Sequence, residues 1–392
     1  MFLKYCLLSS LIFLMLSCQT YKKNNQGFYN PQSLSKADSK KYKLDPKFYK
    51  KTTEVQNILI ASSANVSDTA HRETAYLFDL MMQKIKPDIA QRIRDKELLC
   101  ILVAWNELTS DVPQFASKKT GKELDFYNWR ARGFLSKKDN RFVVFFAEED
   151  VLEYEGGAKT ESILVHEFGH VVHKAGFDPK LENKLTETFY KSMNAKLWRD
   201  GLAAQRFRRV TSRSPVCLLD ALKESFPDIP EQLLIKCLDG GDIRVNNQRV
   251  NTNVKVTKDD DVRIFFGGPK KCYATKNKAE YFAEGFQIWF DTNRTMDHDH
   301  NHIRTREQLK KYDPYLAGFC ELVIDDTDWR FTSPSKRAGK KHLFDFDPKK
   351  SPIKTDPDHI KLAALDYYDK YWKDYWKRLA DKHGVKLKPE VK

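Results

Sequence analysis

Two histidines and a glutamate in the stretch SILVHEFGHVVHKAGF, residues 162–177, have the types and the spacing of a metal centre for hydrolysis. Residues four apart lie on one face of an α-helix, so His166 and His170 can each offer a ring nitrogen to one ion. Glu167 can then reach a water on that ion and accept its proton. The motif predicts one Zn2+ ion, but it supplies only two of the ligands.

A catalytic zinc ion needs a third protein ligand and an open position for water. His173 lies two helical turns from His166, a span that suits one tetrahedral ion poorly. A metzincin would have glycine at 173 and histidine at 176, whereas this chain has His173 and Gly176. We therefore expect His173 to have a polar or supporting role.

The segment KKCYATKNKAEYFAEGFQIWFDT, residues 270–292, offers a better candidate. Glu280 and Glu284 lie four residues apart, on one face of a predicted helix rich in aromatic and small residues. One carboxylate can bind zinc, and the other can accept the N–H of a liganding histidine and fix its tautomer. A solvated pair of carboxylates is the alternative. We favour the first interpretation because carboxylates buried among aromatic residues need partners.

HEFGH followed by YATKNKAEYFAEGF resembles the catalytic domain of anthrax toxin lethal factor and its bacterial relatives, which include the proline-proline endopeptidases. The resemblance implies a zinc endopeptidase of the gluzincin type. Six positions match that family's site in residue type: the zinc ligands His166, His170 and Glu280, the general base Glu167, the oxyanion donor Tyr273 and the supporting Glu284.

An insert explains the long separation between His170 and Glu280. Residues 215–268 read as two short helices followed by short strands with Asn- and Asp-rich turns. GGDIRVNNQRV and VTKDDDVRIF are similar to the small RNA-binding module of ribosomal small-subunit proteins and pseudouridine synthases. Asn247 stands where that module commonly has glycine, and asparagine also tolerates a left-handed turn. We do not expect RNA as a partner of an exported protein, and interpret the module as a packing or substrate-binding insert.

The elements that must position these residues predict a zincin-like fold of the α+β class. In it the HExxH helix lies beside a small mixed sheet, a helical subdomain follows, and the small α+β insert is added. HRETAYLFDLMMQKI has helical periodicity, and LLCILVAW and RFVVFFAEE read as buried strands. YNWRARGF reads as a loop or strand edge. We expect the active-site helix to run from Thr160 to Gly176, and a further helical stretch to follow it up to about residue 208. We expect the strand RFVVFFAEE to bind an extended peptide along its edge.

Three further stretches have two interpretations each. The acidic residues after RFVVFF could favour a basic substrate or form a solvated loop: Glu148, Glu149, Asp150, Glu153 and Glu155. MDHDHNH, residues 296–302, could hold a second metal ion through His298, His300 and His302, or be a weak, exposed chelator. The C-terminal LAALDYYDKYWKDYWKRLADKHG is expected to pack on the core, and a sugar or membrane contact is its alternative.

The first residues predict export and lipid anchoring. MFLKYCLLSSLIFLMLSC has a positive Lys4 and an apolar run too short to span a bilayer. Its end resembles the lipobox of bacterial lipoproteins, which implies cleavage before Cys18 and lipidation of that cysteine. A plain secretory signal, and hence a secreted protein, is the alternative. In an exported protein, disulfides among the remaining cysteines are allowed but not required. The chain has no CxxC, which argues against cysteine-based zinc binding and thioredoxin-like chemistry.

These predictions divide the chain into five parts: signal peptide 1–17, tether 18–50, first catalytic part 51–214, insert 215–268, and second catalytic part with the aromatic C-terminal helix 269–392. The net charge of +14 favours an acidic partner, although basic residues can also simply be spread over a solvated surface. We expect a membrane-anchored zinc endopeptidase of the bacterial cell envelope that acts on peptide or protein substrates. A cell-wall amidase, or a binding lipoprotein with a vestigial metal site, is the alternative.

Overall fold

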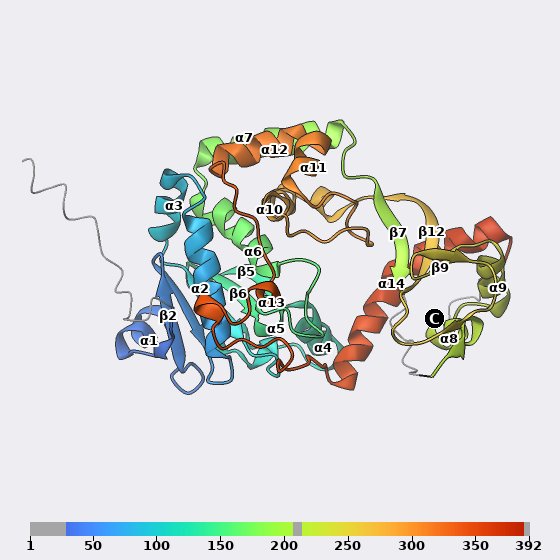
Figure 1. The fold of residues 1–392 in the computed structure, drawn as a ribbon, viewed down its shortest axis with the longest axis horizontal. Coiled ribbons are helices and arrows are strands. Elements are labelled where there is room, and N and C mark those ends of the chain that lie inside the picture. The colour runs from blue at the N-terminus through green and yellow to red at the C-terminus, as the bar shows by residue number, and fades with distance from the viewer. Residues whose placement is uncertain (1–28, 207–213, 388–392) are drawn as a thin grey trace, which may run out of the picture.

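The computed structural model describes residues 29–206 and 214–387 and shows a mixed α+β fold (Figure 1). Its larger sheet has six strands in the order β1-β2-β3-β4-β6-β5. The strands are β1 (Gln32–Ser33), β2 (Lys51–Val55), β3 (Ile58–Ser62), β4 (Leu99–Val103), β5 (Gly133–Lys138) and β6 (Arg141–Ala147). β4 is parallel to β3 and β6, and the remaining pairs are antiparallel. The predicted α+β class with a mixed sheet is confirmed.

β4 lies inside the sheet and is buried along its whole length. Successive side chains of a strand point to opposite faces. Accordingly, Cys100 and Leu102 pack in one core, and Leu99, Ile101 and Val103 pack in another. A continuous apolar run is expected where both faces of a strand are covered, so the interpretation of LLCILVAW as a buried strand is confirmed.

The strand RFVVFFAEE is β6, but it does not lie at the edge of the sheet. It pairs with β4 on one side and with β5 on the other. Asp139 and Asn140 have φ angles of 46° and 65°, and this left-handed turn folds β5 back against β6. YNWRARGF, expected as a loop or strand edge, instead ends helix α4 (Gly121–Arg130) and begins β5. On this side of the sheet, the edge strand is therefore β5 and not β6.

Residues 29–50 fold onto the sheet, so the tether prediction is wrong for this part. They include β1 and helix α1 (Lys36–Tyr42). Tyr42, Leu44 and Tyr49 pack in the core on the second face of the sheet. The large apolar side chains among the lysines explain why this polar-looking segment is ordered.

The predicted signal peptide 1–17, the lipidation site Cys18 and the tether up to residue 28 lie outside the described residues. Within the part of the chain that the structure describes, each helix is too short or too polar to cross a membrane.

On the opposite face of the sheet, α2 (Asp68–Met82), α5 (Glu148–Val151) and α6 (Ile163–Val171) contact its strands. α10 (Lys278–Trp289) packs on α6, and three helices pack on α10: α7 (Pro179–Asn194), α11 (Arg306–Tyr312) and α12 (Pro314–Val323). α3 (Pro87–Arg94) contacts the turn after α6, and α13 (Pro334–Arg337) follows α12 along the chain. The HExxH helix α6 is capped by Ser162, two residues after the predicted start. A π-helical turn, Val172–Gly176, extends it to the predicted end. The prediction of a helical stretch up to residue 208 is wrong beyond Asn194, where α7 ends, because Gly201–Arg206 forms strand β7.

The predicted insert has its own core and its own sheet. Its two short helices are α8 (Leu218–Ser225) and α9 (Glu231–Asp239), as expected. The second sheet, in the order β10-β9-β12-β7, adds β9 (Ile243–Val245), β10 (Gln248–Val250) and β12 (Val262–Lys270) to β7, and β8 (Val216–Cys217) pairs with β11 (Lys255–Val256). Asn246 and Asn247 have φ angles of 52° and 65°, so the predicted left-handed turn is confirmed.

The C-terminal helix α14 (Asp358–His383) packs mainly in the core of the insert. Trp372, Trp376 and Leu379 are buried there with Phe266 of β12. The N-terminal half of α14 lies against α4, so this helix connects the insert to the larger sheet (Figure 1). The predicted division placed α14 and β7 with the catalytic part, whereas their apolar side chains complete the core of the insert.

Candidate metal centre

Helices α6 and α10 form the centre because glycine lets them approach closely. Gly169 lies between the two histidines of the motif, on the face that meets α10. A Cβ atom there would be 3.1 Å from both the Cα of Ala283 and the Cβ of Phe286. The absence of a side chain at this position therefore permits the close packing of the two helices. The close approach brings Glu280, in the first turn of α10, opposite His166 and His170.

The three predicted ligands converge on one point. Oε2 of Glu280 lies 3.1 Å from Nε2 of His170 and 3.4 Å from Nε2 of His166. Zinc bonds of about 2.0–2.2 Å in a tetrahedral site place ligand atoms roughly 3.3–3.6 Å apart. The set of two imidazoles and one carboxylate therefore fits a single tetrahedral ion, and these residues form a group that could hold a metal ion.

The centre has a strong negative potential. Burial alone would lower the pKa of His166, but its hydrogen bond to Glu280 and the charges of Glu167 and Glu284 raise it to about 9. Burial opposes the ionisation of Glu280, yet the hydrogen bonds from His166 and His170 hold its pKa well below the usual range. The same potential that keeps a proton on His166 would favour a divalent cation between these groups.

A cleft of about 600 Å3 opens beside the centre, and the predicted general base and oxyanion donor line it. Burial raises the pKa of Glu167, as suits a group that accepts a proton near neutral pH. Oη of Tyr273 donates to Oε1 of Glu280 at 3.2 Å and accepts from Nζ of Lys276 at 3.1 Å. Burial also raises the pKa of Tyr273, so its hydroxyl keeps its proton.

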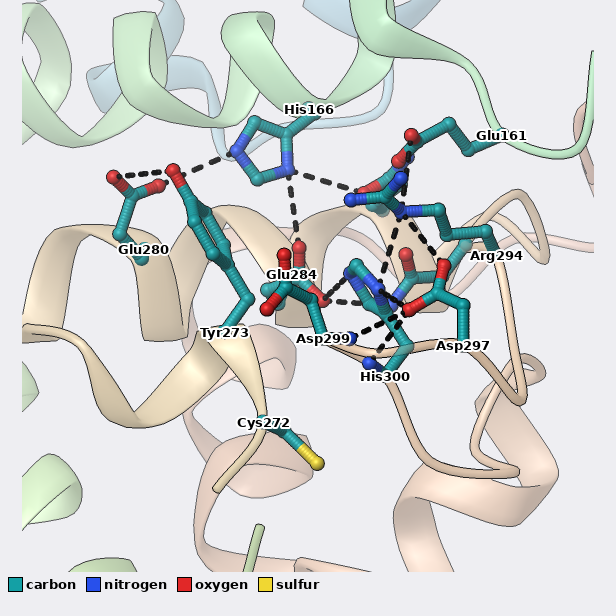
Figure 2. A network of polar contacts seen from close by, with 12 residues as sticks. Glu161, His166, Cys272, Tyr273, Glu280, Glu284, Arg294, Asp297, Asp299 and His300 are labelled. Carbon is teal, nitrogen blue, oxygen red and sulfur yellow. Dashed lines mark hydrogen bonds and ion pairs between the residues drawn. The ribbon is translucent and has the colours of Figure 1, made fainter. Parts of the chain in front are cut away.

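The predicted supporting residue Glu284 lies behind the metal centre. Its Oε1 is 3.5 Å from Nδ1 of His166, the nitrogen that faces away from the cleft (Figure 2). A second partner of Nδ1, which sequence reasoning missed, is Gln287: its Oε1 is 3.1 Å away. Glu280, Glu284 and Gln287 occupy positions i, i+4 and i+7 of α10. Helical periodicity was therefore a signal that could have identified Gln287.

His300 has a role that sequence reasoning missed, because the sequence suggested it only as a ligand of a second metal ion. Its Nε2 lies 3.1 Å from Oε2 of Glu284, and its Nδ1 lies 2.9 Å from Oδ1 of Asp297 (Figure 2). Burial would lower its pKa, but the charge of Glu284 and the bond to Asp297 raise it to about 10. Arg294 then links Asp297 to Glu161 at 3.2 Å on each side. This buried ion-pair chain supports His166 from behind.

The run MDHDHNH does not gather its histidines around a second ion. His298 pairs with Asp299, and the ring of His302 packs against Tyr312. His300 is only 3% exposed, so the alternative of a weak, exposed chelator is also wrong. His300 instead supports the candidate centre from a buried position, where Glu284 and Asp297 neutralise its charge.

His173 lies outside the metal group, as expected from helix geometry. Its Nε2 is 2.7 Å from Oε2 of Glu182, and the ring is buried. Lys278 contacts the other carboxylate oxygen of Glu182 at 2.6 Å. His173 therefore ties the end of the HExxH helix to α7 and, through Glu182, to the start of α10.

Two of the acidic residues after β6, Glu148 and Glu149, are structural, and neither interpretation of this stretch is correct for them. Glu148 and Glu149 are 1% and 2% exposed. Glu149 accepts two hydrogen bonds from the guanidinium of Arg132, and Oε1 of Glu148 accepts from the backbone N–H of Ser67. They are buried because this segment turns back into the core as α5, so they neither meet a substrate nor form a solvated loop.

A second group of potential ligands lies in the insert. Atoms of Cys237, Asp242 and His383 lie within 4.8 Å of one another. However, Asp242 is already in contact with Lys382 and His383, at 2.6 and 2.7 Å. Burial raises the pKa of the Cys237 thiol to about 12. A metal ion would have to displace both the lysine and a tightly held proton, so this group is the weaker candidate.

All five cysteines within the described residues are free thiols: Cys100, Cys217, Cys237, Cys272 and Cys320. Comparisons of the chain with models of protein families, with curated proteins and with solved structures return no match. The function of the centre is therefore inferred from its residues and their geometry.

Proposed function

We propose that this protein is a zinc-dependent endopeptidase of the gluzincin type with a zincin-like catalytic domain. The convergence of His166 and His170 on Glu280, at distances suited to one tetrahedral ion, carries the proposal. Glu167 and Tyr273 line the same cleft, where such an enzyme needs its base and its oxyanion donor. The mixed sheet beside the active-site helix agrees with the fold that the sequence resemblance implies.

The residues around the cleft can carry out peptide hydrolysis. A zinc ion held by the three ligands would supply Lewis-acid chemistry, which polarises a carbonyl group and lowers the pKa of water. Glu167 accepts a proton from the attacking water and returns it to the amine as the peptide C–N bond breaks. The hydroxyl of Tyr273 donates a hydrogen bond to the oxygen that becomes negative in the tetrahedral intermediate. Lys276 strengthens this donor by its positive charge.

The edge strand β5 is placed to hold the substrate. Its residues Gly133, Leu135 and Ser136 line the cleft together with Glu167 and other residues of the centre. Among the described strands, β5 pairs with β6 alone, so backbone groups on its other side can pair with an extended peptide. The role predicted for RFVVFFAEE therefore passes to its neighbour in the hairpin.

We further propose that the enzyme acts outside the cytoplasm of a bacterium, anchored to a membrane by lipid on Cys18. The apolar leader and the sequence LMLSC support this location. One lipid-modified cysteine with several fatty chains would suffice for stable anchoring. Metabolic labelling with a fatty-acid analogue, compared between the full chain and Cys18→Ala, tests the anchor.

Zinc content and peptide cleavage together test the proposed activity. We expect about one zinc ion per chain of purified protein, and its loss in Glu280→Ala. His173→Ala and Cys237→Ala should retain the ion, because neither side chain belongs to the centre. Loss of zinc in His173→Ala but not in Glu280→Ala would show that the ligand assignment is wrong.

Cleavage of a peptide library separates an enzyme from a binding lipoprotein with a vestigial site. We expect zinc-dependent cleavage by the wild type, and a loss of at least about a hundredfold in kcat for Glu167→Ala, since general-base catalysis contributes 10²–10⁴-fold. Glu167→Ala should keep its zinc. A wild-type protein that binds zinc but cleaves no peptide in the library would contradict the proposal.

A further inference from the structure

The wall of the cleft is basic. Arg130, Lys138 and Lys174 line it, and the carboxylates among its described lining residues are Glu167 and Glu280 alone. Those two carboxylates belong to the metal centre, where a divalent ion would offset their charge. The three cations that remain therefore face any substrate in the cleft.

The basic residues come from three elements around the centre. Arg130 is the last residue of α4, Lys138 is the last residue of β5, and Lys174 lies in the π-helical turn after the HExxH helix. All three residues are exposed. A peptide bound along β5 would therefore meet positive charge from more than one side.

Arg130 is close to the reacting groups and has no partner of its own among the described residues. It lines the same cleft as Glu167 and Tyr273. Neither a hydrogen bond nor an ion pair occupies its guanidinium within residues 29–206 and 214–387. A guanidinium is a planar fork of donors that matches a carboxylate in two parallel hydrogen bonds.

Other basic residues near the cleft have partners within the protein. Arg132, two residues after Arg130, binds Glu149 through two nitrogens and donates to the carbonyl of Glu107. Lys276 contacts Tyr273. Lys138 contacts only the ring of Phe115 within the described residues, at 5.2 Å. Within the described residues, Arg130 and Lys138 thus line the cleft without an ion pair of their own.

We propose that the cleft selects substrates with aspartate or glutamate beside the scissile bond, and that Arg130 is the main specificity-determining residue. The preference for a cleavage site beside an acidic residue rests on the proposed peptidase function. The binding of an acidic peptide does not, because the basic wall would bind such a peptide whether or not it is cleaved. Lys138 and Lys174 add to the attraction and make it dependent on salt.

Binding is tested with a variant that does not turn over. Glu167→Gln keeps the three metal ligands, and its affinity for short fluorescent peptides can be measured by anisotropy. We expect a peptide with aspartate to bind about tenfold more tightly than the same peptide with lysine at that position. The ratio should fall as ionic strength rises from about 0.05 M to 0.5 M.

Charge reversal identifies the residue responsible. In the Glu167→Gln background, Arg130→Glu should invert the preference between the two peptides, and Lys138→Glu should reduce it. Lys137→Glu is the matched control, since Lys137 is an exposed neighbour on β5 that does not line the cleft. It should leave the preference unchanged. An equal affinity for both peptides, or inversion by Lys137→Glu as well, would overturn the inference.

Cleavage separates this inference from the proposed function. With the catalytically intact chain, kcat/KM should favour aspartate over lysine near the scissile bond by about tenfold, and Arg130→Glu should invert this ratio. Cleavage without charge preference would overturn the inference and leave the endopeptidase standing. Charge-selective binding without any cleavage would leave the acidic ligand standing and contradict the endopeptidase.

Discussion

The side-chain oxygen of Gln287 lies 3.1 Å from Nδ1 of His166. The amide nitrogen of Gln287 donates to Glu161, to the carbonyl of Ser162 and to the carbonyl of Thr292. These three acceptors fix the orientation of the amide, so that its oxygen accepts the N–H of His166. When a metal ion replaces the proton on Nε2, the imidazole is thereby kept in the form with N–H on Nδ1, which a metal ion at Nε2 requires.

Replacing this amide should weaken metal binding without removing a ligand. Gln287→Met keeps the volume of the side chain but loses its hydrogen bonds. We expect the affinity for zinc to fall by roughly 10–100-fold, the usual effect of removing the partner of a liganding histidine. Competition with a chromophoric chelator measures this affinity. An unchanged affinity in a folded variant would show that Gln287 does not orient His166.

Filling the contact between α6 and α10 should disturb both stability and the metal site. Gly169→Ala places a methyl group 3.1 Å from the Cα of Ala283, which belongs to a buried helix and cannot move cheaply. We expect a loss of about 1–3 kcal/mol in the free energy of unfolding, together with weaker zinc binding.

Gly318→Ala is the matched control for this prediction. Gly318 also lies inside a helix, α12, but a Cβ atom there meets nothing within 4 Å. The better helix propensity of alanine should stabilise this variant by up to about 1 kcal/mol. Urea denaturation compares the two variants, and an equal gain at both positions would contradict the role of Gly169 in packing.

His71 should make the stability of the protein depend on pH. Its Nε2 lies 2.7 Å from Oγ of Ser62, and its Nδ1 lies 3.0 Å from Oγ1 of Thr53. Burial, reinforced by the charge of Lys51, lowers its pKa to about 3. The folded protein therefore keeps His71 neutral where the unfolded chain, with a pKa of about 6.5, takes up a proton.

The sign of the effect follows from this lowered pKa. The stabilising contribution of His71 is complete above about pH 6.5 and is lost as the pH falls toward 3. Between these pH values, the protonation of His71 in the unfolded chain lowers the free energy of unfolding by up to about 1.4 kcal/mol per pH unit. His71→Gln should lack this component of the slope. Denaturant melts of both proteins from pH 7 down to about 4 measure it, and parallel profiles would rule it out.

The C-terminal helix should be required for the insert. Trp376 is 4% exposed and packs against the rings of Phe226 and Phe266, with centroids 5.0 and 5.2 Å away. Trp376→Ala should destabilise this unit by about 3–5 kcal/mol, because it leaves a large cavity. Hydrogen exchange should show faster exchange in α8, α9 and β12.

Leu362→Ala is the control on the same helix. Leu362 is 59% exposed, so its removal should change the unfolding free energy by no more than about 0.5 kcal/mol. If exchange in the insert accelerates equally in both variants, or in neither, α14 does not complete the core of the insert.

The local parts of the metal centre could be predicted because helix geometry is local. The spacing of His166 and His170 places two nitrogens on one face wherever α6 lies. The aromatic surroundings of Glu280 and Glu284 indicated buried carboxylates, and the structure buries Glu284. The two helices and the strands of the insert were predicted for the same reason, since each follows from periodicity and turn residues within a few positions.

The supporting contacts depend on groups far apart in the sequence. The acidic residues after β6 looked like a surface feature, and only the fold buries Glu149 against Arg132. His300 appeared to belong to an exposed loop, and only its approach to Glu284 reveals its role. The periodicity of one segment does not indicate which charged side chains will pair with each other, because such pairs form between elements that pack together in the fold.

The amino-acid sequence by itself determined which groups this protein offers to the candidate metal centre: two histidines one helical turn apart, a glutamate beside the first of them, and a helix with two carboxylates among aromatic residues. The tertiary structure decided which residues complete that chemistry and what a substrate meets. It selected β5 over β6 as the edge strand, placed Gln287 behind His166 and left Arg130 unpaired among the described residues at the cleft. The physical reason is that residue types and short spacings set what a group can do, whereas burial and long-range packing set its partners.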